Sequence, residues 1–474
     1  MLFNSLDFAL FLPIVFAVYW TAKTQPQRNL ILLVASGVFY SWWDIRFLIL
    51  IVLSICIDFW SARRIAAHST VRLRQRWLLV SLAANLGTLA IFKYYGFFVD
   101  SFVDGFRLLG VQLQPTTLEI ILPVGISFYT FQTLSYTIDV YRGHLRPVRD
   151  FLQFATFVSF FPQLVAGPIE RAQRLLPQFA DIQSFNSMCA TVGLRLILWG
   201  VFKKMVIADN CGIYVDQIFA EPTAYNSTTL ILGAVLFAFQ IYGDFSGYSD
   251  IAIGTGRLFG IRLMTNFATP YFARDLGEFW RRWHISLSTW FRDYVYIPLG
   301  GSRHGKWCTA RNVMVVFLTS GLWHGANWTF VVWGGLHGLF FLPAVWSARH
   351  RRYVKTEVAG YKALPRILLT FSLVTFCWIF FRSDNLTAAL FYLQEMADWT
   401  TLGLPFAFKK LPVTLLLIGF MLGLEWLTRH DAYPLERLLA TTSRWKRWSF
   451  YAFLVFLIGA YAQTAHTPFI YFQF

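Results

Sequence analysis

The chain has 474 residues, of which 56% are hydrophobic, 19% aromatic and only 14% charged. A soluble protein carries nearly twice that share of charged residues, so the composition excludes an ordinary soluble protein and indicates a helical protein that crosses a membrane many times. The net charge of +16 does not indicate nucleic-acid binding, because the basic residues lie in the loops between apolar runs, where membrane topology places them.

Apolar runs long enough to cross a bilayer recur along the whole chain, and we expect eleven to thirteen spans or re-entrant segments. The N-terminal run lacks a basic region and a small-residue cleavage site, and we interpret it as a retained span. The predicted spans are residues 7–22, 29–44, 46–62, 77–99, 119–140, 151–166, 190–208, 228–243, 312–346 (two segments), 367–382, 411–428 and 447–463.

The apolar runs follow one another along the whole chain and leave no stretch for a separate folded domain, and no fixed-period repeat or pair of matching halves indicates a solenoid or an inverted-repeat transporter. The sequence therefore predicts one all-α, polytopic membrane domain over residues 1–474. Its predicted parts are N-terminal spans in 1–150, a core in 151–346 that carries the polar motifs, and C-terminal spans in 347–474.

The distribution of basic residues predicts the orientation in the membrane. The loop at 63–76 contains five arginines and should be cytoplasmic, as should the basic loop at 142–149. The loop at 100–119 has Asp100, Asp104 and Glu119 but Arg107 as its only basic residue, so it should face outward. These assignments place the N-terminus outside. The basic, aromatic stretch 271–311 should lie at the cytoplasmic interface.

Common soluble-enzyme and metal motifs are missing. The cysteines at 56, 189, 211, 308 and 377 show no CxxC spacing, and the chain has no HExxH, Walker A or GxSxG motif. The sequence therefore predicts no metal site, and the cysteines are interpreted as small core residues.

Polar residues concentrate between residues 240 and 340. Asp244 and Asp250 lie at the end of an apolar run. Two interpretations are open: the carboxylates form ion pairs with nearby arginines and hold the loops in place, or they have a functional role. A helix from about residue 277 would place Arg281, His284 and Ser288 on one face. We expect the helix to be wedged into the membrane interface by three tryptophans, Trp280, Trp283 and Trp290.

The motif GLWHGANW places His324 between two apolar runs. An ionisable residue inside a membrane is by default a functional hypothesis. A desolvated neutral imidazole can accept a proton from a hydroxyl group. Gly321 and Gly325 would allow a substrate or another backbone to come close, and Asn327 could orient the ring or hold an oxyanion. For His337, in the Gly-rich sequence GGLHG, a structural role in helix packing is the competing interpretation.

Several stretches together resemble the membrane-bound O-acyltransferase (MBOAT) superfamily, in particular the bacterial branch that contains the alginate O-acetylation membrane protein. They are LPVGISFYTFQTLSYTIDVYRG, FFPQLVAGPIER, QIYGDFSGYSDIAIG, EFWRRWHISLSTWFRDYVYIPLGG, GLWHGANWTFVVWGGLHG and the ending PFIYFQF.

The resemblance implies a helical bundle with a central tunnel in a bacterial cytoplasmic membrane, His324 as the essential catalytic residue and His284 as a second position near the tunnel. The residues expected to support the site or line the tunnel are Asn327, Trp323, Asp244, Arg281, Ser288 and His337. The resemblance further implies no bound cofactor, acetyl-CoA as the acyl donor, an extracytoplasmic SGNH-hydrolase-like acetyltransferase as partner, and a polysaccharide export complex.

The alternatives left open by the sequence are of three kinds. Within the family, peptidoglycan O-acetylation and teichoic-acid D-alanylation compete with acetylation of an exported alginate- or cellulose-like polysaccharide, and a carrier protein competes with CoA. Two alternatives lie outside the family. One is a polysaccharide transporter or flippase with a proton path through Asp244, Asp250 and His324, and the other is a structural member of an export complex.

Overall fold

The computed structural model describes residues 1–113, 120–165, 167–347, 360–431, 433, 435, 439, 442–463 and 469–470. Within these residues the chain is helical and contains no strand, which confirms the all-α prediction. The residues group into two compact units, one made of 1–189 with 256–263 and the other of 190–255 with 264–474. The prediction of a single membrane domain in three consecutive parts stays a prediction.

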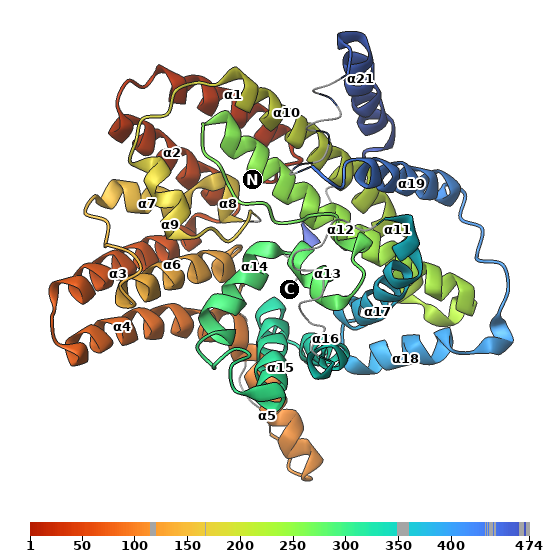
Figure 1. The fold of residues 1–474 in the computed structure, drawn as a ribbon. Coiled ribbons are helices and arrows are strands. Elements are labelled where there is room, and N and C mark those ends of the chain that lie inside the picture. The colour runs from red at the N-terminus through yellow and green to blue at the C-terminus, as the bar shows by residue number, and fades with distance from the viewer. Residues whose placement is uncertain are drawn as a thin grey trace. The chain divides into compact units, whose positions relative to one another are not determined.

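The first unit contains nine α-helices in its described residues, with a π-helical turn, Ala90–Tyr94, joining α4 to α5. They are α1 Leu6–Thr21, α2 Gln25–Ser41, α3 Leu48–Ala67, α4 Val71–Leu89, α5 Tyr95–Leu108, α6 Ile126–Tyr141, α7 Phe151–Ser159, α8 Phe161–Leu164 and α9 Ala172–Leu175. Helices α3, α4 and α6 pack against one another (Figure 1).

The second unit contains the helices that carry most of the predicted site. They are α10 Ser187–Val201, which begins just before the unit, α11 Asp209–Ala220, α12 Ser227–Leu258, α13 Leu276–Arg282, α14 Ile285–Phe291, α15 Gly305–His324, α16 Trp328–Trp346, α17 Leu364–Arg382, α18 Leu386–Met396, α19 Leu411–Leu427 and α21 Arg444–Tyr461. A π-helical segment, η4 Phe202–Ala208, joins α10 to α11, and a second, η7 Arg292–Tyr296, follows α14.

Five helices in the described part of the chain are long and apolar enough to cross a membrane, so the protein is a multi-pass membrane protein. They are Ile45–Ala67, Val71–Leu108, Ser227–Leu258, Trp328–Trp346 and Tyr361–Arg382. The predicted total of eleven to thirteen spans or re-entrant pieces stays a prediction.

The predicted single span at 151–166 is wrong. Helix α7 ends at Ser159, Phe160 is non-helical with φ −49° and ψ 107°, and α8 begins at Phe161. Pro162 has no N–H to donate to a continuous helix, so the chain breaks before it and starts again. The predicted span at 228–243 is too short, because α12 continues to Leu258 and contains both Asp244 and Asp250.

Helices α15 and α16 lie side by side (Figure 1), and glycines bring their backbones together. A Cβ added to Gly321 would lie 2.2 Å from the Phe330 carbonyl oxygen, and one added to Gly334 would lie 2.3 Å from the Phe317 carbonyl oxygen. A Cβ at Gly325 would overlap the Phe330 ring at 2.1 Å. The glycines of the GLWHG motif therefore admit the neighbouring helix, which is the second of the two roles predicted for them.

The tryptophans predicted at the membrane interface are placed differently. Trp283 is fully buried, with its ring centroid 5.1 Å from those of Phe267 and Trp378, and Trp290 is 6% exposed. Trp280 lines a pocket. The prediction of three interfacial anchors is wrong, because these side chains fill the core and a cavity wall of the second unit.

Candidate active site

His324 is the last residue of α15, at the point where the chain turns to enter α16. Its side chain is buried, with 3% of the residue exposed. Aromatic rings surround it: the centroids of Trp323, Trp333 and Phe381 lie 4.9, 5.0 and 5.5 Å from that of the imidazole. The prediction that His324 lies in a buried, apolar setting is confirmed.

His284 lies at a break between α13 and α14, with φ 42° and ψ 54°. The single helix predicted through Arg281, His284 and Ser288 is therefore wrong, because a left-handed residue cannot continue a right-handed helix. The break turns the His284 side chain inward, where it is fully buried. Its ring centroid lies 6.4 Å from that of His324, and Trp323 contacts both rings.

Asn266 orients His284, and sequence reasoning did not find it. The Asn266 Oδ1 atom lies 3.1 Å from His284 Nδ1 and accepts a hydrogen bond from the Ser286 hydroxyl at 2.9 Å. The Asn266 amide nitrogen donates to the Ser249 hydroxyl at 3.1 Å, which fixes the amide orientation. Because a carbonyl oxygen only accepts, a neutral His284 carries its proton on Nδ1 and its lone pair on Nε2. No motif or spacing around residue 266 indicated this partner.

His337 lies on α16, fully buried among aromatic rings. Its ring centroid lies 5.0 Å from that of Trp280 and 5.0 Å from that of Trp333, which also contacts His324. Neither ring nitrogen of His337 has a hydrogen-bond partner among the described residues. The structure thus brings the three predicted histidines into one aromatic cluster, with Trp333 between His324 and His337.

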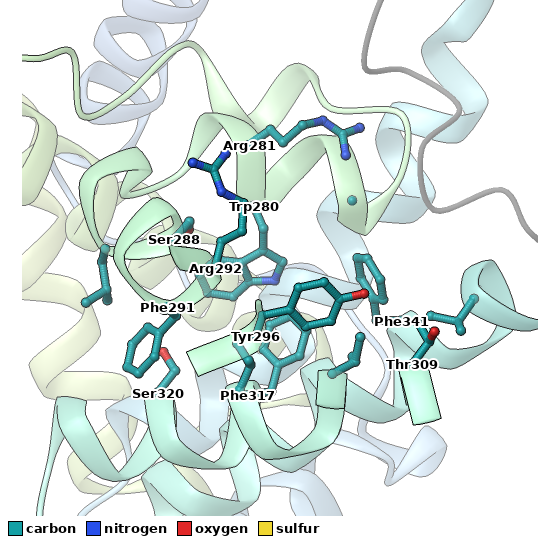
Figure 2. A pocket seen from close by; sticks show the side chains of 15 residues that line it. Trp280, Arg281, Ser288, Phe291, Arg292, Tyr296, Thr309, Phe317, Ser320 and Phe341 are labelled. Atoms are coloured by element: carbon teal, nitrogen blue, oxygen red, sulfur yellow. The ribbon is translucent and has the colours of Figure 1, made fainter. Parts of the chain in front are cut away.

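A cavity of about 520 Å³ (Figure 2) lies beside this cluster, because Trp280 both lines the cavity and contacts His337. Two predicted residues, Arg281 and Ser288, line it, and so does Arg292. Its lining is otherwise mainly apolar: Gly277, Trp280, Leu287, Phe291, Tyr296, Thr309, Val313, Val316, Phe317, Ser320, Phe341 and Val345. Ser320 precedes His324 by four residues on α15, so the cavity wall and the histidine share a helix face.

The cavity combines two arginines with aromatic walls, which suits an anionic group attached to an apolar chain. Glu278, on the same short helix as Arg281, forms ion pairs with Arg274 and Arg282, both at 2.9 Å. Burial raises the pKa of Glu278, but hydrogen bonds from Arg274 and the charge of Arg282 outweigh it and hold the pKa below its ordinary value.

Asp244 and Asp250 form ion pairs, as the first of the two interpretations predicted, but the partners are lysines. Asp250 lies 2.7 Å from Lys203, and Lys204 lies 2.8 Å from both Asp244 and Asp209. Both lysines lie in η4 and are 2% exposed. The sequence analysis did not single out these two lysines, and only tertiary packing places them opposite the carboxylates of α12.

Asp244 also binds the C-terminal segment, through a hydrogen bond of 2.7 Å from the Ile470 N–H to its Oδ2 atom. The neighbouring Phe469 packs on Phe245, whose ring centroid lies 4.6 Å from that of His284. Of the ending PFIYFQF, the other residues lie outside the described part of the chain.

The contacts of Asn327 differ from those predicted for it. Its side-chain oxygen accepts from the Thr329 N–H at 3.0 Å and caps α16, and its amide nitrogen donates to the Asp384 carbonyl at 2.7 Å. Both ends of the amide are used in these contacts, so Asn327 shapes the turn after His324 rather than orienting the ring.

Among the described residues there is no group of three histidine, cysteine, aspartate or glutamate side chains that could hold a metal ion. The candidate site is therefore a buried pair of imidazoles beside a cavity edged by arginines.

The family model that matches this chain is that of the membrane-bound O-acyltransferase family, over residues 142–382. The chain is 42% identical over 416 residues to the probable alginate O-acetylase AlgI of Pseudomonas aeruginosa, which covers 85% of this chain and 76% of the relative. It is 37% identical over 430 residues to the peptidoglycan O-acetyltransferase of Helicobacter pylori, covering 84% and 80% of the two chains. It is 29% identical over 312 residues to the teichoic acid D-alanyltransferase of Streptococcus thermophilus, covering 60% and 75%.

The matched region contains His284, His324, His337 and the whole lining of the cavity. The match and the helical, membrane-spanning fold lead to one conclusion: the chain belongs to the membrane-bound O-acyltransferase family.

Proposed function

We propose that this O-acyltransferase takes an acetyl group from acetyl-CoA on the cytoplasmic side of the membrane and passes it to the outer side, where an exported polysaccharide is O-acetylated. The observation that carries the proposal is the pair of buried imidazoles, His284 and His324, with ring centroids 6.4 Å apart beside a cavity of about 520 Å³. The relatives named as an alginate O-acetylase and a peptidoglycan O-acetyltransferase support an acetyl group and a cell-envelope or exported polymer.

His324 is the proposed general base. The hydroxyl oxygen of the acceptor attacks the carbonyl carbon of the acetyl thioester, and the hydroxyl proton passes to the His324 imidazole. The carbon–sulfur bond then breaks, the imidazolium returns the proton to the leaving thiolate, and free CoA and an acetyl ester result. Burial among Trp323, Trp333 and Phe381 excludes water that would otherwise hydrolyse the thioester.

The donor is proposed to enter through the arginine-edged cavity. Arg281 and Arg292 supply positive charge for the phosphates of CoA, and the aromatic walls suit its pantetheine arm. An acidic carrier protein is the competing donor, and it would use the same arginines. Acetyl-CoA acts here as a substrate, and no resident cofactor is proposed.

The proposed setting is a bacterial cytoplasmic membrane, with the N-terminus outside and the stretch 271–311 on the cytoplasmic side. The proposed partners are an extracytoplasmic SGNH-hydrolase-like acetyltransferase, which would complete transfer to the polymer, and a polysaccharide export complex. The arginines at positions 63, 64, 72, 74 and 76 lie at the adjoining ends of α3 and α4 rather than in a loop, and their charge supports this orientation.

The test replaces His324 by alanine and measures the acyl content of the exported polymer by mass spectrometry. We expect the acetyl group to be lost while the polymer is exported in normal amount and the protein inserts normally. His304→Ala is the matched control, because His304 is an exposed histidine of the same region. Normal acetylation in the His324→Ala strain would overturn the proposed mechanism.

The same measurement separates the alternatives. A D-alanyl ester in place of acetyl would assign the chain to the chemistry of the teichoic acid relatives, and loss of the polymer itself would indicate transport. A donor assay with purified protein, with acetyl-CoA or an acylated carrier protein, distinguishes the two acyl sources.

A further inference from the structure

Asp58 is a carboxylate buried in the middle of α3, in the first unit. It is fully buried within the candidate membrane span Ile45–Ala67. It accepts hydrogen bonds from Thr137 at 2.9 Å, from Asn85 at 2.8 Å and from Ser81. These donors lie on α4 and α6, so Asp58 joins three helices of the first unit.

Three side-chain oxygens, those of Ser54, Asn85 and Thr133, lie together beside this carboxylate. Ser54 Oγ lies 3.4 Å from Asp58 Oδ2, 2.9 Å from Asn85 Oδ1 and 3.3 Å from Thr133 Oγ1. Thr133 Oγ1 lies 3.3 Å from Asn85 Oδ1 and 3.2 Å from the Thr130 carbonyl oxygen. The two hydroxyl groups supply one hydrogen each, so they cannot bridge all of these pairs. The lone pairs of these oxygens outnumber the hydrogens that they share, so the cluster has acceptor capacity left for a cation.

A small cavity of about 110 Å³ opens onto this cluster. Ser54 and Asn85 line it on the side of the cluster, and the other lining residues are Thr88, Thr130, Tyr129, Leu50, Leu53, Ile57 and Ala84. Tyr129 is 2% exposed, and its hydroxyl has no hydrogen-bond partner among the described residues. A buried hydroxyl without a partner is costly, and Tyr129 is one of the residues that line the cavity, which points to an occupant of the cavity. The volume has room for an ion and water molecules.

The charge of Asp58 is not balanced by a basic side chain. Its interactions in the described part of the chain are hydrogen bonds from hydroxyl and amide groups, without an ion pair. A single negative charge inside a membrane span, without a positive partner, is expensive. A bound cation would remove this cost and would also be coordinated by the neighbouring oxygens of Ser54, Asn85 and Thr133.

We propose that Asp58, Ser54, Asn85 and Thr133 form a binding site for a monovalent cation of the size of Na⁺. Around a cation with oxygen ligands at about 2.4 Å, neighbouring ligands lie about 3.4 Å apart, close to the separations seen here. The cavity supplies the remaining positions, through water and the Tyr129 hydroxyl.

The ligand chemistry excludes other ions. The set consists of one carboxylate with neutral oxygens, so a divalent ion would leave a net positive charge inside the membrane. The described residues offer no cluster of histidine, cysteine and acidic side chains for a transition metal. The bound cation cross-links α3, α4 and α6 and so stabilises this part of the bundle.

The first test uses the purified full-length protein in detergent. NaCl is titrated against choline chloride at constant ionic strength, and Tm and equilibrium binding of ²²Na⁺ are measured. We expect Tm to rise by about 2–4 °C with Na⁺ and binding to saturate at one ion per chain. Equal Tm in both salts, with no saturable ²²Na⁺ binding, would overturn the proposal and leave Asp58 protonated or solvated by water alone.

The second test uses variants. Asp58→Asn keeps the shape of the side chain but removes its charge, so it should abolish ²²Na⁺ binding and the Na⁺-dependent rise in Tm. Thr133→Val, which removes one ligand oxygen, should weaken binding about tenfold and keeps the proposal testable if Asp58→Asn does not fold. Asp100→Asn, at an exposed carboxylate of the same unit, should bind like the wild type. Wild-type binding by Asp58→Asn would refute the site.

Discussion

Gly321 is the position where adding a single methyl group should disturb both the packing of α15 against α16 and catalysis. A Cβ at this position would lie 2.2 Å from the Phe330 carbonyl oxygen, whereas an ordinary van der Waals contact begins at 3.4 Å. The obstacle is backbone rather than a flexible side chain, so α15 and α16 must separate by about 1 Å, a displacement that can lower a rate about 100-fold. His324 follows Gly321 by three residues on α15 and would move with it.

The sign of the change in stability caused by Gly321→Ala shows whether the added methyl group clashes with α16. An alanine in a helix interior is favoured over glycine by about 1 kcal/mol, so without a clash the variant would be more stable. Overpacking of the helix contact costs about 1–3 kcal/mol, so we expect net destabilisation together with a loss of acyl transfer of about 100-fold.

Gly335→Ala is the matched control, because its Cβ would meet only Leu318 at 3.6 Å. The assay combines thermal unfolding of the purified protein with the acetyl content of the exported polymer. If Gly321→Ala acetylates normally and is as stable as Gly335→Ala, close backbone packing does not position His324.

Three further predictions concern the polar contacts. Asn266→Ala removes the partner of His284 Nδ1, so donor turnover by the purified protein should fall about tenfold or more. Tm should fall as well, because Ser249 and Ser286 lose a buried hydrogen-bond partner, so turnover is compared well below the lowered Tm; unchanged kinetics would show that the tautomer of His284 is not important. Asp250→Asn leaves Lys203 buried without its ion-pair partner and should lower the free energy of unfolding by about 3–5 kcal/mol in denaturant titration, whereas the double variant Lys203→Met/Asp250→Leu should recover most of it. The pKa of Glu278 is held below its ordinary value, so the contribution of its charge to stability is present at neutral pH and is lost as the pH falls through the lowered pKa. Glu278→Gln should therefore reduce the fall in Tm between about pH 5 and pH 3, and an unchanged slope of Tm against pH would contradict this.

The helical, membrane-spanning class of the protein could be predicted from sequence because hydropathy and rise per residue are local properties. The apolar runs of α1, α3, α16 and α17 each became a helix close to the predicted range. Two helix predictions failed for reasons of backbone conformation. The apolar run at 151–166 is interrupted before Pro162, and the helical spacing around His284 gave no sign of its left-handed backbone.

The sequence by itself determined that His324 is buried in an apolar setting and that polar chemistry gathers between residues 240 and 340, because a costly residue in an apolar run is visible without a structure. Only the tertiary structure decided which groups meet: Asn266 with His284, Lys203 with Asp250, and the backbone of α16 with Gly321. It also moved Asn327 from the imidazole to a helix cap. The physical reason is that the cost of burying a polar residue can be predicted from the composition and periodicity of the surrounding sequence. Hydrogen bonds and ion pairs instead depend on distances between segments that the chain brings together only when it folds.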